Sequence, residues 1–181
     1  MHSRLPRPVL LMDAGTGDSI RLPTKANVLA RLPECAVAHF ACHGSSDLTD
    51  PSNSSLLLYD HDSDPFTVAG LAEVRLDQAQ LAYLSACRTA FTGRADLIDE
   101  AIHLTSACQL MGFPHVIGTM WAIGDTLAAN VADAFYRALS DTGGALRTTR
   151  AAEALHRTIL GLRDRFPQAP SLWAAYLHAG A

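Results

Sequence analysis

Hydrophobic positions in this chain form short unbroken runs separated by longer segments in which apolar and polar residues alternate at helical spacing. The unbroken runs cover residues 37–41, 81–85 and 116–121. Runs of this length without a polar face are typical of strands covered on both sides. Because such strands alternate with helices along the chain, the pattern predicts a three-layer α/β fold. In this class a mostly parallel sheet carries helices on both faces.

The helical segments repeat apolar residues every three or four positions. The long ones cover residues 96–111, 125–139 and about 145–165. Gly112 ends the first of them, and Asp125 is predicted to cap the second. A shorter helix is expected over Lys25–Arg31, directly after Thr24, because threonine is a favoured N-cap residue.

The remaining predicted elements are short and are bounded by Pro, Gly, Asp and Ser residues. We expect strands at residues 9–12, 56–59, 65–68 and 172–177, the middle two forming a hairpin, and a short helix at 68–76. The first part of the chain otherwise has little periodicity. We therefore divide the chain into an irregular N-terminal segment over residues 1–23 and one domain over residues 24–181.

Composition argues against a nucleic-acid-binding, membrane or exported protein. The chain has 181 residues, 49% of them hydrophobic, and a formal net charge of −4, so it lacks the basic surface that nucleic acids or anionic membranes require. No apolar run approaches the roughly 20 residues of a membrane span, and no export signal is recognisable. The four cysteines are widely spaced, which favours free thiols in a reducing cytoplasm. We expect a cytoplasmic protein with no nucleic-acid or membrane partner.

Two of the predicted strands are followed by reactive side chains. His43 comes just after the first run, in the string AHFACHG, and Cys87 ends the string LSAC. Neighbouring parallel strands end at the same edge of a sheet, where an imidazole and a thiol together form the parts of a cysteine hydrolase. Gly44 would permit an unusual backbone angle and close approach of a substrate. The alternative is that Cys87 is a small buried apolar residue and His43 an ordinary loop histidine.

A zinc site built from Cys35, His39, Cys42 and His43 is the competing interpretation of the same region. Cys42 and His43 are adjacent, so in an extended chain they point to opposite faces and converge poorly on a metal. His39 lies in the middle of a predicted strand and is interpreted as a neutral core histidine bonded to a backbone carbonyl. We therefore predict no metal.

Other polar and aromatic residues have structural explanations. Asp47 and Asp50 are interpreted as loop caps or solvated carboxylates, so the sequence names no third catalytic group. Residues 13–19 faintly resemble a phosphate loop but lack its Gly-Lys-Ser/Thr ending, which makes a turn the better interpretation. Core packing is the expected role of the remaining residues of interest, which are His103, Cys108, Trp121 and Trp173.

Seven strings in series resemble the CHAT domain, a family related to caspases and separase. They are HFACHG, SSLLLYD, LSAC, DEAIHL, VIGTMWAIGD, FYRAL and LWAAYLHAG. The resemblance as a whole runs from about Thr24 to Gly180. The resemblance implies a caspase-like fold and a cysteine endopeptidase without a cofactor. His43 takes the position of the family's catalytic histidine and Cys87 that of its nucleophile, and the amides of Gly44 and Cys87 would form the oxyanion hole.

The resemblance also implies features of the substrate. Ser85, two residues before the nucleophile, would line the pocket for the side chain preceding the cleaved bond. It has no charge, so strong selection for Arg or Lys through this position is not expected. The substrate would be a specific partner protein, in defence or cell-death signalling, and a regulatory or sensor domain or partner would control cleavage.

Two departures from the family pattern stand out. Arg88 occupies a position that is often acidic or Gln, and the family usually has a further strand and helix before this part, so the chain is expected to start inside the domain. Two alternatives remain open. One is a non-catalytic CHAT-like module for protein interaction, and the other is an α/β hydrolase or ligand-binding domain of a different family.

Overall fold

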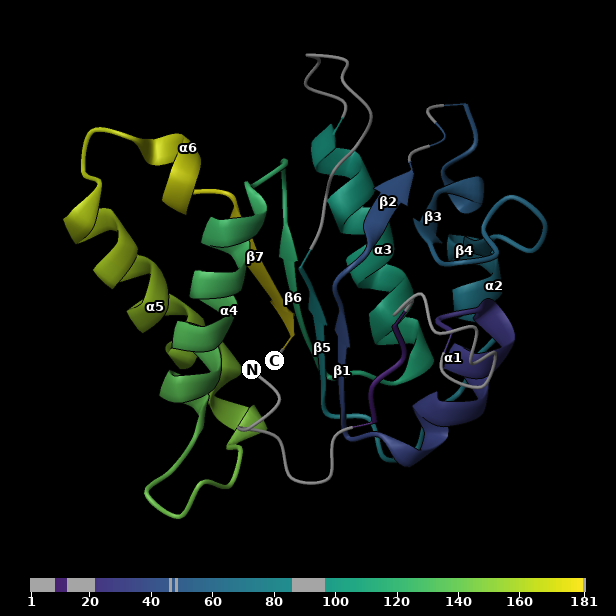
Figure 1. Ribbon diagram of the computed structural model, residues 1–181, viewed down its shortest axis with the longest axis horizontal. Helices are drawn as coiled ribbons and strands as arrows, with labels where there is room; N and C mark the ends of the chain where they lie inside the picture. The colour runs from purple at the N-terminus through teal and green to yellow at the C-terminus, as the bar shows by residue number, and fades with distance from the viewer. Residues whose placement is uncertain (1–8, 13–21, 46, 48, 86–96, 181) are drawn as a thin grey trace.

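The computed structural model describes residues 9–12, 22–45, 47, 49–85 and 97–180, with side chains from residue 103 onward in the helix that starts at Leu97. A central sheet runs through the molecule with helices on both sides (Figure 1). Its strands, in spatial order, are β1 (Val37–Phe40), β5 (Leu81–Leu84), β6 (His115–Thr119) and β7 (Tyr176–Gly180). The first three are parallel and β7 is antiparallel to β6. The predicted α/β fold class, with a mostly parallel sheet between helices, is confirmed.

The side chains of β5 show why its sequence is apolar throughout. Leu81 and Tyr83 lie in a hydrophobic cluster with α4 (Asp125–Leu139) and α5 (Ala151–Arg165). Ala82 and Leu84 lie in a second cluster with residues of α3 (Leu97–Met111). Successive strand residues point to opposite faces, so a strand covered on both sides has no polar face.

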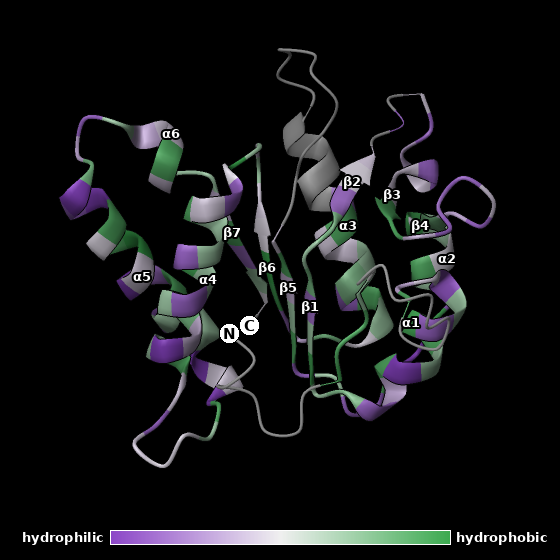
Figure 2. Cartoon of the chain, viewed as in Figure 1, coloured by the Kyte–Doolittle hydropathy of each residue, from purple (hydrophilic) through white to green (hydrophobic). Residues whose placement is uncertain are grey.

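Helices on the two faces follow the predicted stripes. Along α4, Val131, Phe135 and Leu139 are buried, and the inward stripe of α5 is likewise apolar. Figure 2 shows hydrophilic residues alternating with hydrophobic ones along both helices, the pattern of helices with one face on a core. The opposite face is covered by α3, with α1 (Lys25–Arg31) and α2 (Val68–Ala72) beside it.

The N-terminal part of the domain agrees closely with the prediction for α1. This helix has the predicted bounds, and the Thr24 side chain accepts a hydrogen bond from the Asn27 amide at 3.2 Å. The predicted hairpin is present as β3 (Ser55–Leu57) and β4 (Phe66–Thr67), both shorter than expected. A third strand, β2 (His43–Ser45), pairs antiparallel with β3 to complete a small sheet that was not predicted.

Some predicted elements are wrong. Residues 9–12 form no strand, and the side chains of Val9, Leu10 and Met12 are exposed. Gly124, not Asp125, occupies the N-cap position of α4, and Asp125 lies in its first turn, where a carboxylate is favoured by the helix dipole.

The C-terminal part also differs from the prediction. Residues 172–177 do not form one strand, because Pro170 occupies the first position of α6 (Pro170–Trp173) and fits a helix start. The helix α5 begins at Ala151, after a 3₁₀ turn over Thr148–Arg150, and not near residue 145.

Neither tryptophan fills the core as expected. Trp121 and Trp173 are half-buried, and their indole N–H groups donate to the backbone carbonyls of Ser171 and Phe166 at 2.9 and 3.2 Å. Cys108 is fully buried, as predicted, whereas His103 is only half-buried.

Gly112, which ends α3, is a position where glycine is required. Its φ of 120° is in the region that other residues avoid, and a Cβ there would collide with the backbone carbonyl oxygen of Leu76. We expect Gly112→Ala to lower the free energy of unfolding by at least about 2 kcal/mol. Gly144→Ala is the control, since Gly144 has a φ of 81° with no atom within 4 Å of a Cβ, and should cost about 1 kcal/mol. Urea unfolding measures both, and equal losses would contradict the steric explanation.

Candidate active site

The carboxyl ends of β1 and β5 meet at one edge of the sheet. The two strands pair in parallel from Val37 and Leu81 to Phe40 and Leu84. One residue beyond the strand, the Ser85 amide donates a hydrogen bond to the Phe40 carbonyl at 2.9 Å. The chain therefore leaves both strands at the same level, and the segments that follow start side by side.

His43 lies three positions after Phe40 and begins β2. It stands opposite Leu57 in the small antiparallel sheet, and its side chain is exposed. Pairing with β3 therefore holds the backbone that carries this imidazole, while the ring remains accessible to solvent.

Gly44, the next residue, is buried and stands opposite Leu56 in the same sheet. It is not among the glycines with a positive φ in the described part of the chain, which are Gly112, Gly144 and Gly180. Gly44 takes part in a strand, so it does not use the unusual backbone angle that glycine would permit. What glycine contributes here is the absence of a side chain.

Cys87 and Arg88 lie outside the described residues. Cys87 follows Leu84 by three positions, the same separation as that between Phe40 and His43. Ser85 is described, and it is half-buried at the end of β5. The contact between the Cys87 thiol and the His43 imidazole stays a prediction.

His39, in the middle of β1, belongs to an aromatic cluster and not to the edge. Its ring stacks on Tyr83 with 4.7 Å between centroids, and its Nδ1 lies 3.2 Å from the Tyr136 hydroxyl oxygen. Burial lowers the pKa of His39 to about 4, so the ring is neutral at pH 7. The predicted neutral histidine is confirmed, but its hydrogen-bond partner is a tyrosine hydroxyl and not a backbone carbonyl.

The four residues considered for zinc do not share one site. His39 contacts the tyrosines on the α4 side of the sheet, whereas Cys42 packs against the cluster on the α3 side. Cys35 precedes β1 and lies within hydrogen-bond distance of the Arg31 carbonyl, 3.3 Å away. Within the described ranges, no three His, Cys, Asp or Glu side chains are grouped so that they could hold a metal ion.

Two of the described thiols are unsuited to act as nucleophiles. Burial raises the pKa of Cys108 to about 12, and burial also raises the pKa of Cys35. A thiolate is the reactive form of cysteine, and a raised pKa lowers the fraction of thiolate at neutral pH, so both side chains are less reactive there.

Asp47 and Asp50 stabilise the loop after β2. The Asp47 carboxylate accepts bonds from the Thr49 hydroxyl at 2.7 Å and from the backbone amides of Thr49 and Asp50. These bonds lower the pKa of Asp47 to about 2. Asp50 accepts a bond from the Ser52 amide at 3.1 Å and caps a 3₁₀ turn. Their interpretation as loop caps is confirmed.

The pKa of His39 leads to a pH prediction. Since the folded pKa of about 4 is below the ordinary value of 6.5, the unfolded chain binds this proton first as the pH falls. The neutral His39 ring thereby contributes up to about 3 kcal/mol to the free energy of unfolding. This contribution is present in full above pH 6.5 and is lost as the pH falls from 6.5 to 4. We expect His39→Phe to remove this part of the pH dependence in urea unfolding at pH 7 and pH 5. An unchanged pH dependence would contradict the assignment.

A mostly parallel sheet between helices, with a histidine just beyond its carboxyl edge, is consistent with a caspase-like α/β domain. A model of the CHAT domain family matches residues 8–181, nearly the whole chain. The chain therefore belongs to the CHAT domain family, which makes it a domain of the caspase-like peptidase family. A search of curated proteins found no match. None of the helices in the described ranges has the length and apolar character that crossing a bilayer requires.

Proposed function

We propose that this CHAT domain is a cysteine endopeptidase in which Cys87 is the nucleophile and His43 transfers the proton. The observation that supports it best is the joint ending of β1 and β5, where the Ser85 amide bonds to the Phe40 carbonyl at 2.9 Å. Each reactive residue comes three positions after its strand, so segments of equal length start from adjacent points. Such segments can bring an imidazole and a thiol together at the sheet edge.

The proposed reaction begins when the Cys87 thiol gives its proton to His43 and the sulfur attacks the carbonyl carbon of the scissile bond. The amides of Gly44 and Cys87 hold the resulting oxyanion, and in known enzymes a single such donor contributes about 10²–10³-fold in rate. His43 then protonates the leaving amine, and a thioester remains on Cys87. Water attacks the thioester as His43 takes its proton, which releases the acid and restores the thiol.

The proposed substrate is a specific partner protein, cleaved in the cytoplasm without a cofactor. Ser85 would line the pocket for the side chain preceding the cleaved bond, and it is uncharged and half-buried at the end of β5. It offers no carboxylate, so cleavage after Arg or Lys would need another acidic group. A role in defence or cell-death signalling, under a sensor domain or partner, completes the proposal.

Selective alkylation tests the activated thiol. In iodoacetamide at pH 7, we expect Cys87 to react faster than Cys35 and Cys108, whose pKa values are raised. The measurement is mass spectrometry of peptides after short exposures, compared with His43→Ala, in which the alkylation of Cys87 should slow. Equal rates at Cys87 in wild type and His43→Ala would contradict the dyad and favour a non-catalytic interaction module.

A further inference from the structure

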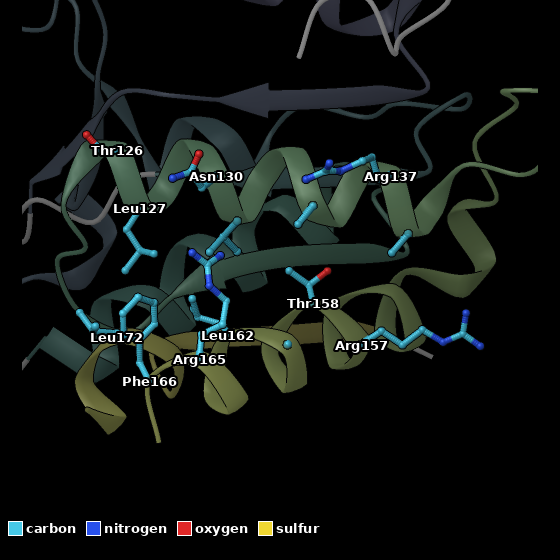
Figure 3. A pocket seen from close by; sticks show the side chains of 14 residues that line it. Thr126, Leu127, Asn130, Arg137, Arg157, Thr158, Leu162, Arg165, Phe166 and Leu172 are labelled. Atoms are coloured by element: carbon cyan, nitrogen blue, oxygen red, sulfur yellow. The ribbon is translucent and has the colours of Figure 1, made fainter. Parts of the chain in front are cut away.

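A groove with a volume of about 720 Å³ runs between α4 and α5, on the outer side of the helix layer. Figure 3 shows that residues of both helices line it, with Leu127 and Leu172 near Phe166 at one end and Thr158 toward the other. Its lining is mainly apolar. The larger apolar side chains are Leu127, Val131, Leu162, Phe166 and Leu172.

Gly161 keeps the groove open from the side of α5. It lies inside the helix, where glycine costs about 1 kcal/mol relative to alanine. A Cβ at this position would have no atom within 4 Å, so the space beside it is empty. Across the groove, the small side chains of Ala134 and Ala138 on α4 also leave room. The groove is thus wide enough to admit side chains from another molecule.

The charged residues that line the groove all have one sign. They are Arg137 on α4 and Arg157 and Arg165 on α5, and no carboxylate belongs to the lining. Arg137 and Arg157 each pair with an acidic residue of their own helix and are still about 60% exposed. The Arg165 guanidinium lies 5.5 Å from the ring centroid of Phe166, and Figure 3 shows it extending from α5 toward α4. Asp133 and Glu153 offset the charges of Arg137 and Arg157, but their carboxylates do not line the groove, so the charged groups that face it are basic.

We propose that the groove binds an acidic amphipathic helix of a partner protein. Helices commonly dock through an apolar face laid into such a groove. Arg157 and Arg165 are eight residues apart, which is about 12 Å along α5. A helix lying along α5 would match them with carboxylates seven or eight positions apart, and its apolar residues between them would enter beside Gly161. The proposal does not depend on peptidase activity.

The test uses two fluorescent 16-residue helical peptides with the same leucine stripe, one with glutamates at its borders and one with lysines. Fluorescence anisotropy with the full chain should show the glutamate peptide binding at least about tenfold more tightly. Arg165→Glu should weaken its binding at least about tenfold. Arg163→Glu is the matched control, because Arg163 lies on the same helix, is 51% exposed and does not line the groove. It should change binding less than about twofold.

A second pair of variants tests the shape of the groove. Gly161→Leu should abolish binding of the glutamate peptide, whereas Gly161→Ala should bind it as wild type does, and circular dichroism checks that both variants are folded. Equal binding of the two peptides, equal effects of the two arginine variants, or no effect of Gly161→Leu would overturn the proposal. Two other results would also overturn it. If the chain formed dimers in sedimentation and Gly161→Leu abolished them, the groove would be assigned to a second copy of the chain. If the chain bound palmitate saturably but not the peptides, and Gly161→Leu abolished palmitate binding, the groove would be assigned to a fatty acid.

Discussion

Replacing Cys87 with alanine is expected to lower kcat/KM for peptide-bond cleavage by about 10³–10⁶-fold. The variant lacks the sulfur that forms the thioester, and only binding and oxyanion contacts would remain. Cleavage of a peptide library by the full chain, followed by mass spectrometry, supplies the substrate for this measurement. The His43→Ala variant should lose activity to a similar extent.

Two comparisons make this prediction specific. The Cys87→Ala/His43→Ala double variant should be little worse than either single variant, because the two groups are proposed to act as a unit. Cys35→Ala is the control, since the Cys35 thiol lies before β1 within hydrogen-bond distance of the Arg31 carbonyl, and it should retain activity within about twofold. Full cleavage by Cys87→Ala would refute the proposed nucleophile. If the fold-losses in kcat/KM of the two single variants multiplied in the double variant, the proposal that Cys87 and His43 act as one unit would be refuted.

The sheet and the long helices could be predicted from the sequence because each of them buries apolar residues in a regular pattern along its length. The strand β5 is apolar at every position, since each of its faces meets helices, and its start was predicted at the observed residue, Leu81. Most positions of the predicted stripes of α4 and α5 are buried for the same reason, whereas Leu127 and Ile159 are half-buried. Signals of this kind depend on the local sequence and on the period of the element.

Elements that depend on a distant partner could not be predicted. The strand β2 is only three residues long, and it exists because Gly44 pairs with Leu56 in β3. A Gly and a Ser in three residues are weak strand formers, so the local sequence favoured a loop. At the other end of the chain, the aromatic residues before Leu177 suggested a strand, whereas Pro170 starts a short helix there.

In the candidate site, too, some features could be predicted from the local sequence and others depend on contacts with distant residues. The shared edge followed from the parallel pairing of two buried strands, and the pairing of Phe40 with Leu84 confirms it. The place of His43 on a strand could not be foreseen, since it depends on the contact between β2 and β3. The aromatic environment of His39 was also missed, because it is assembled from Tyr83 on β5 and Tyr136 on α4. Position 87 itself remains a prediction.

The Phe135→Ala variant is expected to lower the free energy of unfolding by about 3–5 kcal/mol. Phe135 is fully buried on α4, and its ring lies 5.2 Å from that of Tyr83 on β5. Removing it takes away apolar contacts and leaves a cavity in a part of the core that supports β5. For a chain of this size the loss corresponds to a fall in Tm of about 10–15 °C.

The control for Phe135→Ala is Tyr59→Ala, which removes an aromatic ring that is 55% exposed and should change stability by only about 0.5 kcal/mol. Phe135→Leu should fall between them, because it refills part of the cavity. Guanidinium unfolding measures all three variants. Since Ser85 and Cys87 follow β5 in the chain, the proposed peptidase activity of Phe135→Ala should disappear at the lowered Tm but remain measurable well below it. Equal losses from Phe135→Ala and Tyr59→Ala would show that this contact between α4 and β5 does not support the sheet.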